Sequence, residues 1–485
     1  MSVSSALSSA LTGLTASARQ AEVVSSNVAN ASTPGYARRT VSLSAQVLGG
    51  SGQGVLVRGV QRDVDLYLIN DRRAAQAGAG DRDVRASFLK QLEQIFGQPE
   101  DGASLSARVA AFDAALLEAA SRPESEARLT TAVDAARSLA NSLNAASDAI
   151  QQERARTDQK IATAVADLNS ALQQVNDLNA SIRSFSGAGQ DVSALLDQRQ
   201  QIVDRIAALV PLREIPRDHD QIALMTTGGA VLLDGKAAEL GFAGVHMVVP
   251  EMTQASGGLS GLTINGRPMA TAGETSLILG GELAGLFAVR DELAVAGQAR
   301  LDALARDLVE RFAEAGLDPT LTPGDPGLFT DAGGAFAAAD EVGLSSRLAL
   351  NAAVDPRQGG LASRLRDGLG AAATGPSGNA ALLVALSDAL TAARPLSSTG
   401  FAPASRSLLG LTAELMSSVS TERLNADVER AFAAARHATL DEMEKAGGVD
   451  TDQEMQALLV IEKNYAANAK VIQTVDEMIS TLLGL

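Results

Sequence analysis

The sequence predicts a mainly α-helical fold with a small inserted antiparallel β domain, in which the N- and C-terminal helices of a long helical bundle pair as a coiled coil. Three observations favour this class. Of 485 residues, 46% are hydrophobic but only 3% aromatic, which favours helices over sandwiches or barrels. A heptad pattern without Gly or Pro fills Glu124–Ser186, and strand-like alternation is concentrated in 212–281.

Both ends of the chain carry the 3–4 spacing of apolar residues that is typical of coiled-coil helices. The predicted assembly residues on these tracks are Leu7, Leu11, Leu14, Val28, Leu458, Ile461, Tyr465, Ile472, Val475, Ile479 and Leu482. Asn468 is the one polar residue on the C-terminal track, and a lone buried Asn can fix register. One such helix is marginal in water. Each helix therefore needs a partner, either the other terminal helix or a globular core.

Between the ends, the first predicted feature is a break after the N-terminal helix. Thr33-Pro34-Gly35-Tyr36 has the Pro-Gly order of a type II turn. Alternating Val41/Leu43 and Val55/Val57, separated by the glycines of 49–52, predict a short β connector. Helices resume at Asp63, with predicted breaks at 78–80 and at Gly97.

The longest pattern, Glu124–Ser186, predicts a single helix on the order of 90 Å long. Two antiparallel helices turning near 151–157 are the alternative, but that stretch lacks turn residues. Ser147, Arg154 and Thr157 are the exceptions on its apolar track. Filament-forming proteins use such rods more often than globular enzymes do.

The β domain is predicted from short alternating segments separated by turn signals. The segments are 222–224, 231–233, 245–249 and 277–279, and the turns include Asp234-Gly235 and Asn265-Gly266. The expected domains are a terminal coiled coil (1–32 with 449–485), a short β connector (33–62), a long-helix bundle (63–211 with 282–446) and the β domain (212–281). Within the bundle, the proline-rich 316–403 is expected to be an irregular insertion.

The sequence predicts no catalytic, cofactor-binding or metal site. The net charge of −17 argues against nucleic-acid binding. Cys is absent, and the three His residues lie far apart without metal-ligand spacing. Asp218-His219-Asp220 is most simply a solvated turn, Asp197-Gln198-Arg199 a charged helix surface, and Arg38-Arg39 a solvated pair or a contact to an acidic neighbouring subunit.

No apolar run is long enough for a membrane span. The N-terminus has no basic n-region, and its first charged residue is Arg19. It therefore lacks the pattern of a cleaved secretory signal.

Both ends resemble a known family. The run 26–36, Ser-Asn-Val-Ala-Asn-Ala-Ser-Thr-Pro-Gly-Tyr, resembles the N-terminal signature of bacterial flagellar rod, hook and hook-associated proteins, and 465–474 resembles their C-terminal signature. Asn27, Asn30, Pro34, Gly35, Tyr36 and Asn468 are the signature residues. Three features resemble those of the family members at the hook–filament junction. They are the long helix, the run Leu195-Leu196-Asp197-Gln198-Arg199, and Gly280–Leu286. The resemblance is strong over about 1–300 and 405–485 and weak across 316–403.

This resemblance implies a non-enzymatic structural subunit, without a cofactor, that lies outside the cell as part of the flagellum. It implies type III export without a cleaved signal peptide, pairing of the terminal helices, and self-assembly into a ring or tube. The implied partners are further copies of the chain, the hook protein, the second hook–filament junction protein, the export apparatus and an export chaperone. Two alternatives stay open: a hook or distal rod subunit, and an extracellular enzyme carried in 212–281 or 316–403.

Overall fold

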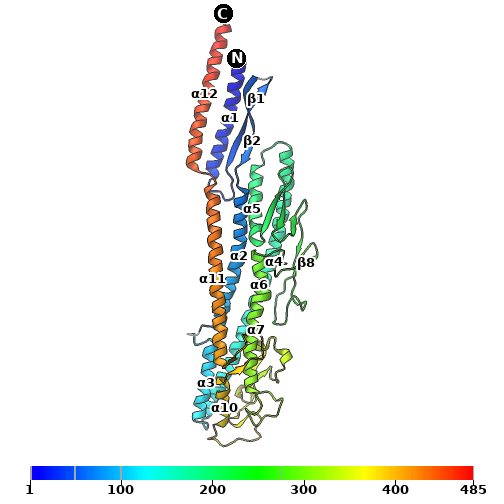
Figure 1. The fold of residues 1–485 in the computed structure, drawn as a ribbon, viewed down its shortest axis with the longest axis vertical. Helices are drawn as coiled ribbons and strands as arrows, with labels where there is room; N and C mark the ends of the chain where they lie inside the picture. Colours follow the sequence, from blue (N-terminus) through cyan, green and yellow to red (C-terminus); the bar gives the residue numbers. More distant parts are fainter. Residues whose placement is uncertain (1–2, 49–50, 99–100, 274, 484–485) are drawn as a thin grey trace.

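The computed structural model describes residues 3–48, 51–98, 101–273 and 275–483. These residues form a long rod with both chain ends at one tip (Figure 1). The fold is mainly α-helical, with small antiparallel sheets. Its principal helices are α1 (Val3–Asn30), α2 (Leu66–Phe96), α3 (Leu105–Ser121), α4 (Glu126–Gly187), α5 (Ser193–Leu209), α6 (Glu282–Ala288), α7 (Ala294–Phe312), α10 (Ala381–Thr391), α11 (Leu408–Ala446) and α12 (Thr451–Leu483). A π-helical segment, η1 (Val289–Leu293), joins α6 to α7.

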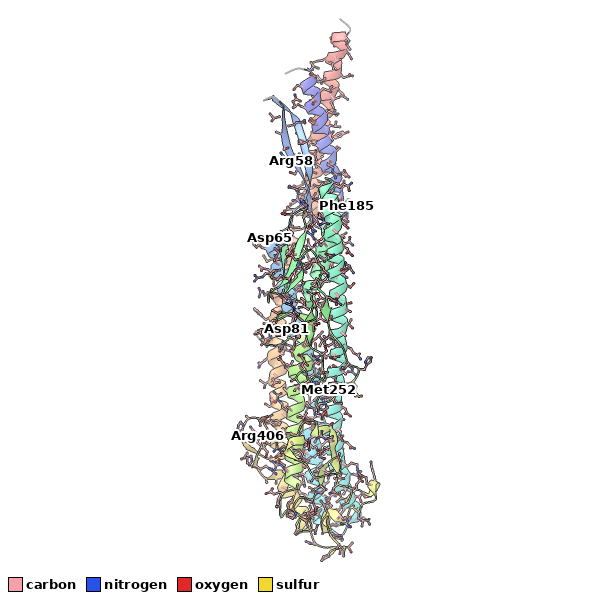
Figure 2. All side chains as sticks on the ribbon, turned by 90° about the vertical axis from the view of Figure 1, so that its right-hand side faces the viewer. Arg58, Asp65, Asp81, Phe185, Met252 and Arg406 are labelled. Carbon is pink, nitrogen blue, oxygen red and sulfur yellow. The ribbon has the colours of Figure 1, made fainter. Side chains whose placement is uncertain are left out.

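The terminal helices pair in an antiparallel arrangement, as predicted for the coiled coil. Gly13 of α1 lies against Asn468 of α12, and Asn27 lies against Glu454. The hairpin of β1 (Arg39–Leu48) and β2 (Ser51–Arg62) packs along α1. We call α1, α12 and this hairpin the terminal stem. Figure 2 shows it projecting beyond the helical body, with Arg58 of β2 labelled on the stem and Arg406 labelled in the lower part of the rod.

The predicted β connector is therefore a hairpin of 10 and 12 residues, longer than a short link. The chain enters it through the predicted type II turn. The backbone N–H of Tyr36 donates to the carbonyl of Thr33 at 3.1 Å, and Gly35 has φ +73°. A Cβ at position 35 would also lie 2.6 Å from Gln201 Cγ. Glycine is therefore favoured here both by the positive φ and by the close approach of Gln201. The predicted glycines 49 and 50 lie outside the described residues.

The long helix α4 runs through two separate hydrophobic cores as one 62-residue element, which confirms the single-helix prediction. Its first half, from Leu129 to Ile150, packs with α2, α3, α7, α10 and α11. Its second half, from Ile161 to Val175, packs with α5, α6 and the small sheets. The predicted polar exceptions Ser147, Arg154 and Thr157 are all buried at the junction of the two cores.

This junction is held by a buried polar network. Arg154 donates to the carbonyls of Arg290 at 3.0 Å and Met252 at 2.6 Å. Asp158 and Arg290, both fully buried, form an ion pair at 2.5 Å. Such pairs require matched partners because an isolated buried charge is costly. Arg154 and Asp158 therefore bind α4 to η1, and Arg154 also binds it to the loop before β7.

The β region contains two three-stranded antiparallel sheets. One joins β3 (Leu212–Pro216), β4 (Ile222–Thr226) and β5 (Val231–Leu233), and the other joins β6 (Leu240–Gly241), β7 (Leu262–Ile264) and β8 (Arg267–Met269). Asn265 and Gly266, with φ of +49° and +75°, form the predicted two-residue hairpin turn between β7 and β8.

Two of the predicted strands were wrong. Residues 245–249 and 277–279 are not in strands. The backbone N–H of Val245 bonds instead to the Asp158 carboxylate at 2.6 Å, so this segment is held against α4 by a side chain in place of a strand partner.

The predicted helix break at 78–80 was also wrong, because α2 continues through it. A Cβ on Gly80 would lie 3.5 Å from Glu282 Cβ and 3.7 Å from the carbonyl oxygen of Ala208. These are ordinary van der Waals distances, whereas a Cβ on Gly285 of α6 would lie 3.0 Å from the carbonyl oxygen of Asp81 in α2. The packing of α2 against α5 and α6 outweighs the low helix propensity of glycine. The predicted end at Gly97 is confirmed, with φ +78°.

The proline-rich insertion lies at the end of the rod opposite the termini (Figure 1). Besides α10, it contains β9 (Phe329–Asp331), η2 (Ala338–Asp340), α8 (Leu344–Arg347), β10 (Leu348–Leu350), η3 (Pro356–Gln358), α9 (Arg364–Asp367) and β11 (Arg394–Pro395), which pairs with β12 (Ser405–Arg406). The division of the chain into four domains stays a prediction.

Candidate functional site: the terminal stem and its joint

The C-terminal half of the stem places most predicted residues on the buried face. Ile461 and Val475 are buried, and Leu458, Ile472 and Ile479 are half-buried. Tyr465 is 45% exposed. The side chain of Leu482 lies outside the described residues. The Asn468 side chain lies against Gly13, in a notch left by the missing side chain of that glycine. A Cβ at position 13 would lie 2.8 Å from the amide nitrogen of Asn468.

On α1, the buried face is rotated by about one residue from the predicted track. Its buried residues are Ala10, Ala16, Ser17, Val23, Val24 and Asn27. Leu7, Leu14 and Val28 are half-buried, whereas Leu11 is 56% exposed. The reason is that α1 packs against the hairpin as well as α12: Thr12 Oγ1 accepts a hydrogen bond from the Val55 N–H at 3.2 Å. That the predicted residues form an interface with another subunit remains a prediction.

Asn27 is the centre of the joint between the stem and the body. It is fully buried, and its side chain makes four hydrogen bonds. Its amide nitrogen donates to the Arg39 carbonyl at 2.9 Å and to Glu454 Oε2 at 3.0 Å. Its amide oxygen accepts from the Tyr36 hydroxyl at 2.9 Å and the Arg39 N–H at 3.0 Å. An amide has two donors and two acceptor sites, so this position uses the whole capacity of Asn.

The other N-terminal signature residues support the turn. Asn30 donates to the Ser26 carbonyl at 2.9 Å. Gln201 of α5 donates to the Pro34 carbonyl at 2.6 Å. The Arg39 guanidinium lies over the Tyr36 ring, 4.7 Å from its centroid. The signature therefore folds as one unit that contacts both α5 and α12.

Glu454 connects this unit to the C-terminal helix. It lies in the first turn of α12, is 1% exposed, and accepts from Arg38 Nε at 2.7 Å as well as from Asn27. A carboxylate in the first helical turn also interacts favourably with the helix dipole. The buried charge of Glu454 is therefore paired and hydrogen-bonded.

Asp197 anchors the same unit to the body. Its carboxylate pairs with Arg39 at 2.7 Å and Arg62 at 2.8 Å, the two residues opposite each other at the start and end of the hairpin. Burial lowers the pKa of Arg62, and the Asp197 carboxylate opposes this effect. One carboxylate thus holds two like-charged side chains together.

These contacts correct two interpretations drawn from the sequence. Asp197 and Arg199 are both buried, so Asp197-Gln198-Arg199 is not a charged surface. Arg199 donates to Asn179 at 2.9 Å. Arg38 and Arg39 are not a solvated pair, because each has a carboxylate partner within the chain.

Sequence reasoning missed the joint because its members are far apart along the chain. Asn27 and Glu454 are separated by 427 residues, and no local spacing links them. The available signal was the signature itself, in which an Asn recurs among small residues immediately before a turn.

Asp218, His219 and Asp220 are exposed in the turn between β3 and β4. His219 and Asp220 both have φ +57°, and Ser186 donates to the Asp220 carboxylate at 2.9 Å. This arrangement matches the solvated turn expected from the sequence.

Within the described ranges, no group of three or more His, Cys, Asp and Glu residues has an arrangement that could hold a metal ion. None of the helices in the described part of the chain combines the length and apolar character needed to cross a bilayer.

Comparison with known families gives three matches along the chain. Residues 89–326 match the flagellar hook-associated protein FlgK helical domain, 7–36 match the flagella basal body rod protein family, and 442–485 match the flagellar basal body rod FlgEFG protein C-terminal family. The two rod-type matches fall on the two helices of the stem. All three matches are to families of flagellar proteins.

Individual relatives show which flagellar protein the chain is similar to. Flagellar hook-associated protein 1 of Salmonella typhimurium is 28% identical over 243 residues, covering 49% of this chain and 44% of the relative. Its counterpart in Bacillus subtilis is 28% identical over 242 residues, covering 46% and 48%. The chain is similar to the flagellar hook-associated protein 1 (FlgK) family over these residues, and spans about half the length of the curated relatives it matches.

A solved structure, that of the flagellar hook junction protein FlgK from Burkholderia pseudomallei, is similar with a TM-score of 0.44 and 24% identity. The match covers 54% of this chain and 46% of that one.

Proposed function

We propose that this chain is a non-enzymatic structural subunit of the bacterial flagellum that forms the junction between hook and filament by self-assembly. The observation that carries the proposal is the terminal stem. Its two helices match rod-type families, pair at one tip of a long rod, and leave large apolar side chains exposed. These exposed residues include Leu11, Met455, Leu459, Val460, Tyr465, Val471 and Met478. Apolar surface of this kind marks sites of protein contact.

A second apolar surface supports contacts between copies along the body. On α11, Leu424, Val428 and Phe432 are each more than half exposed and lie four residues apart, on one face of the helix. In the proposed tube, the stem lines the axis and α11 faces a neighbouring subunit. The predicted interface residues on α1 and α12 are part of this proposal.

The proposed partners are further copies of the chain, the hook protein and the second hook–filament junction protein. Before assembly, the subunit passes through the type III export apparatus with the help of an export chaperone, without a cleaved signal peptide. It then lies outside the cell as part of the flagellum. Absence of Cys suits this route because no disulfide can form after export.

The test is a clean deletion of the gene in a motile strain. The junction role predicts cells with normal hooks and no filaments, which release unpolymerised filament protein into the medium. The alternative role, as a hook or distal rod subunit, predicts loss of the hook itself. Filaments on the deletion strain would contradict both roles.

An inserted enzyme is the remaining alternative, and it has a separate test. A cavity of about 250 Å³ lies beside the loop 253–255 and η1, but its Asp291 carboxylate is held by Arg290 at 2.8 Å. Asp218→Ala combined with His219→Ala alters only an exposed turn. We expect this double variant to swim normally, whereas lost motility in a stably folded variant would argue for chemistry near the β region.

A further inference from the structure

Two contacts between α1 and α12, the close approach of Asn468 to Gly13 and the Asn27–Glu454 hydrogen bond, are spaced in the same way on both helices. Gly13 and Asn27 are 14 residues apart, as are Glu454 and Asn468. Fourteen residues are two heptads of a coiled coil. Both contacts therefore belong to one antiparallel register.

We propose that the Asn27–Glu454 contact is a register lock, which selects this alignment of the terminal helices over alignments shifted by a heptad. The proposal goes beyond the junction role and depends only on the geometry of the stem. Apolar heptad seams tolerate such shifts, because each shift replaces apolar residues with other apolar residues. A buried polar contact distinguishes the registers.

A shift of seven residues removes both contacts. In the shift that carries Asn468 towards Ala6, Glu454 faces Gln20 and leaves both Asn27 and Arg38, while Asn468 leaves the notch at Gly13. In the opposite shift, Glu454 passes beyond the end of α1 at Asn30. A buried carboxylate without its partners is strongly disfavoured. Of these three registers, the observed one alone gives Glu454 both Asn27 and Arg38 as partners.

The lock also fixes the stem on the body. Asn27 binds the backbone of Arg39, and Arg39 pairs with Asp197 of α5. The register of α12 is therefore set against the signature turn and, through it, against α5. Glu454 acts as a positioning residue for the surface that the stem presents to its neighbours.

Absence of Cys in the chain allows a direct test by disulfide trapping in the full-length protein. Gly13→Cys with Asn468→Cys reports the observed register, because these positions are in contact. Ala6→Cys with Asn468→Cys reports the shifted register. Initial cross-linking rates under a mild oxidant are compared on non-reducing gels. Both reporters replace Asn468, so the Asn27–Glu454 hydrogen bond is the contact under test.

We expect the observed-register reporter to cross-link at least tenfold faster than the shifted one. Glu454→Leu should lower this ratio by about tenfold and raise the rate of the shifted reporter. Glu462→Leu, which replaces an exposed carboxylate of the same helix, should leave the ratio within twofold. General destabilisation would slow the first reporter without accelerating the second.

An unchanged ratio in Glu454→Leu would overturn the proposal, as would failure of the observed-register reporter to cross-link in the otherwise unaltered chain. The measurement needs no assembled flagellum. Its outcome is therefore separate from that of the deletion experiment on the junction role.

Discussion

Replacing Asn27 with Ala should release the terminal stem from the body. The side chain supplies hydrogen bonds to both backbone groups of Arg39, to Tyr36 and to Glu454. Glu454 keeps Arg38 as a partner, and the Tyr36 hydroxyl lies 3.3 Å from Ser26 Oγ. The main loss therefore falls on the N–H and C=O of Arg39.

The magnitude follows from these two backbone groups. A buried group left without its hydrogen bond costs about 1–3 kcal/mol, so the expected loss is about 3 kcal/mol after partial hydration. A change of about 1.4 kcal/mol is tenfold in an equilibrium constant. The opening equilibrium of the stem should therefore rise by about a hundredfold.

Hydrogen exchange of the purified full-length protein measures this opening through the amides of α12. We expect exchange in the first half of α12 to accelerate by about a hundredfold, with little change in α4. Asn30→Ala is the matched control, because Asn30 bonds to the carbonyl of Ser26 within its own helix, and it should stay within a few-fold of the unaltered chain. Equal exchange in Asn27→Ala and Asn30→Ala would refute the assignment of Asn27 as the centre of the joint.

Three further predictions concern the stem and the body. Ile472→Asp places a charge on the half-buried seam, at a cost of about 2 kcal/mol, so export should continue while assembly weakens about thirtyfold; Gln473→Asp, at an exposed position, should form normal filaments. Asp158→Ala leaves Arg290 buried without this partner, and guanidinium unfolding should show a loss of about 3 kcal/mol; a loss below about 1 kcal/mol would contradict this. Burial raises the pKa of Asp302, so the folded state favours the protonated carboxyl. The contribution of this group to folding stability is complete below its unfolded pKa of about 3.9. It is lost as the pH rises through the folded pKa. Relative to Asp302→Asn, the unaltered chain should therefore lose stability as pH rises above about 4. If both proteins showed the same dependence of unfolding free energy on pH, the raised pKa of Asp302 would be refuted.

The sequence patterns predicted the long elements well because their periodicity extends over many residues. The heptad track of α4 and the seam of α12 are examples. Asn265-Gly266 was equally reliable because a two-residue turn with positive φ has few sequence solutions. The terminal pairing needed the family resemblance as well as the heptads.

The failures occur where contacts between distant segments determine the structure. Gly80 has poor helix propensity, yet α2 continues through it because the helix packs against α5 and α6. Leu11 fits the α1 track but is exposed, because the hairpin covers another face of the same helix. The sequence pattern predicted surface charge at Asp197, but Arg39 and Arg62 of the hairpin pair with its carboxylate. Charge complementarity across more than a hundred residues leaves no local pattern.

The placement of the insertion at the far end of the rod has a consequence for how such chains diverge. Residues 316–403 enter and leave the bundle between α7 and α11, while the chain ends meet at the opposite tip (Figure 1). Material added or removed there lengthens or shortens the free end without altering the spacing of Asn27, Asp197 and Glu454 in space. Sequence drift and changes in length can therefore accumulate at one pole of the molecule while the other pole keeps a fixed geometry.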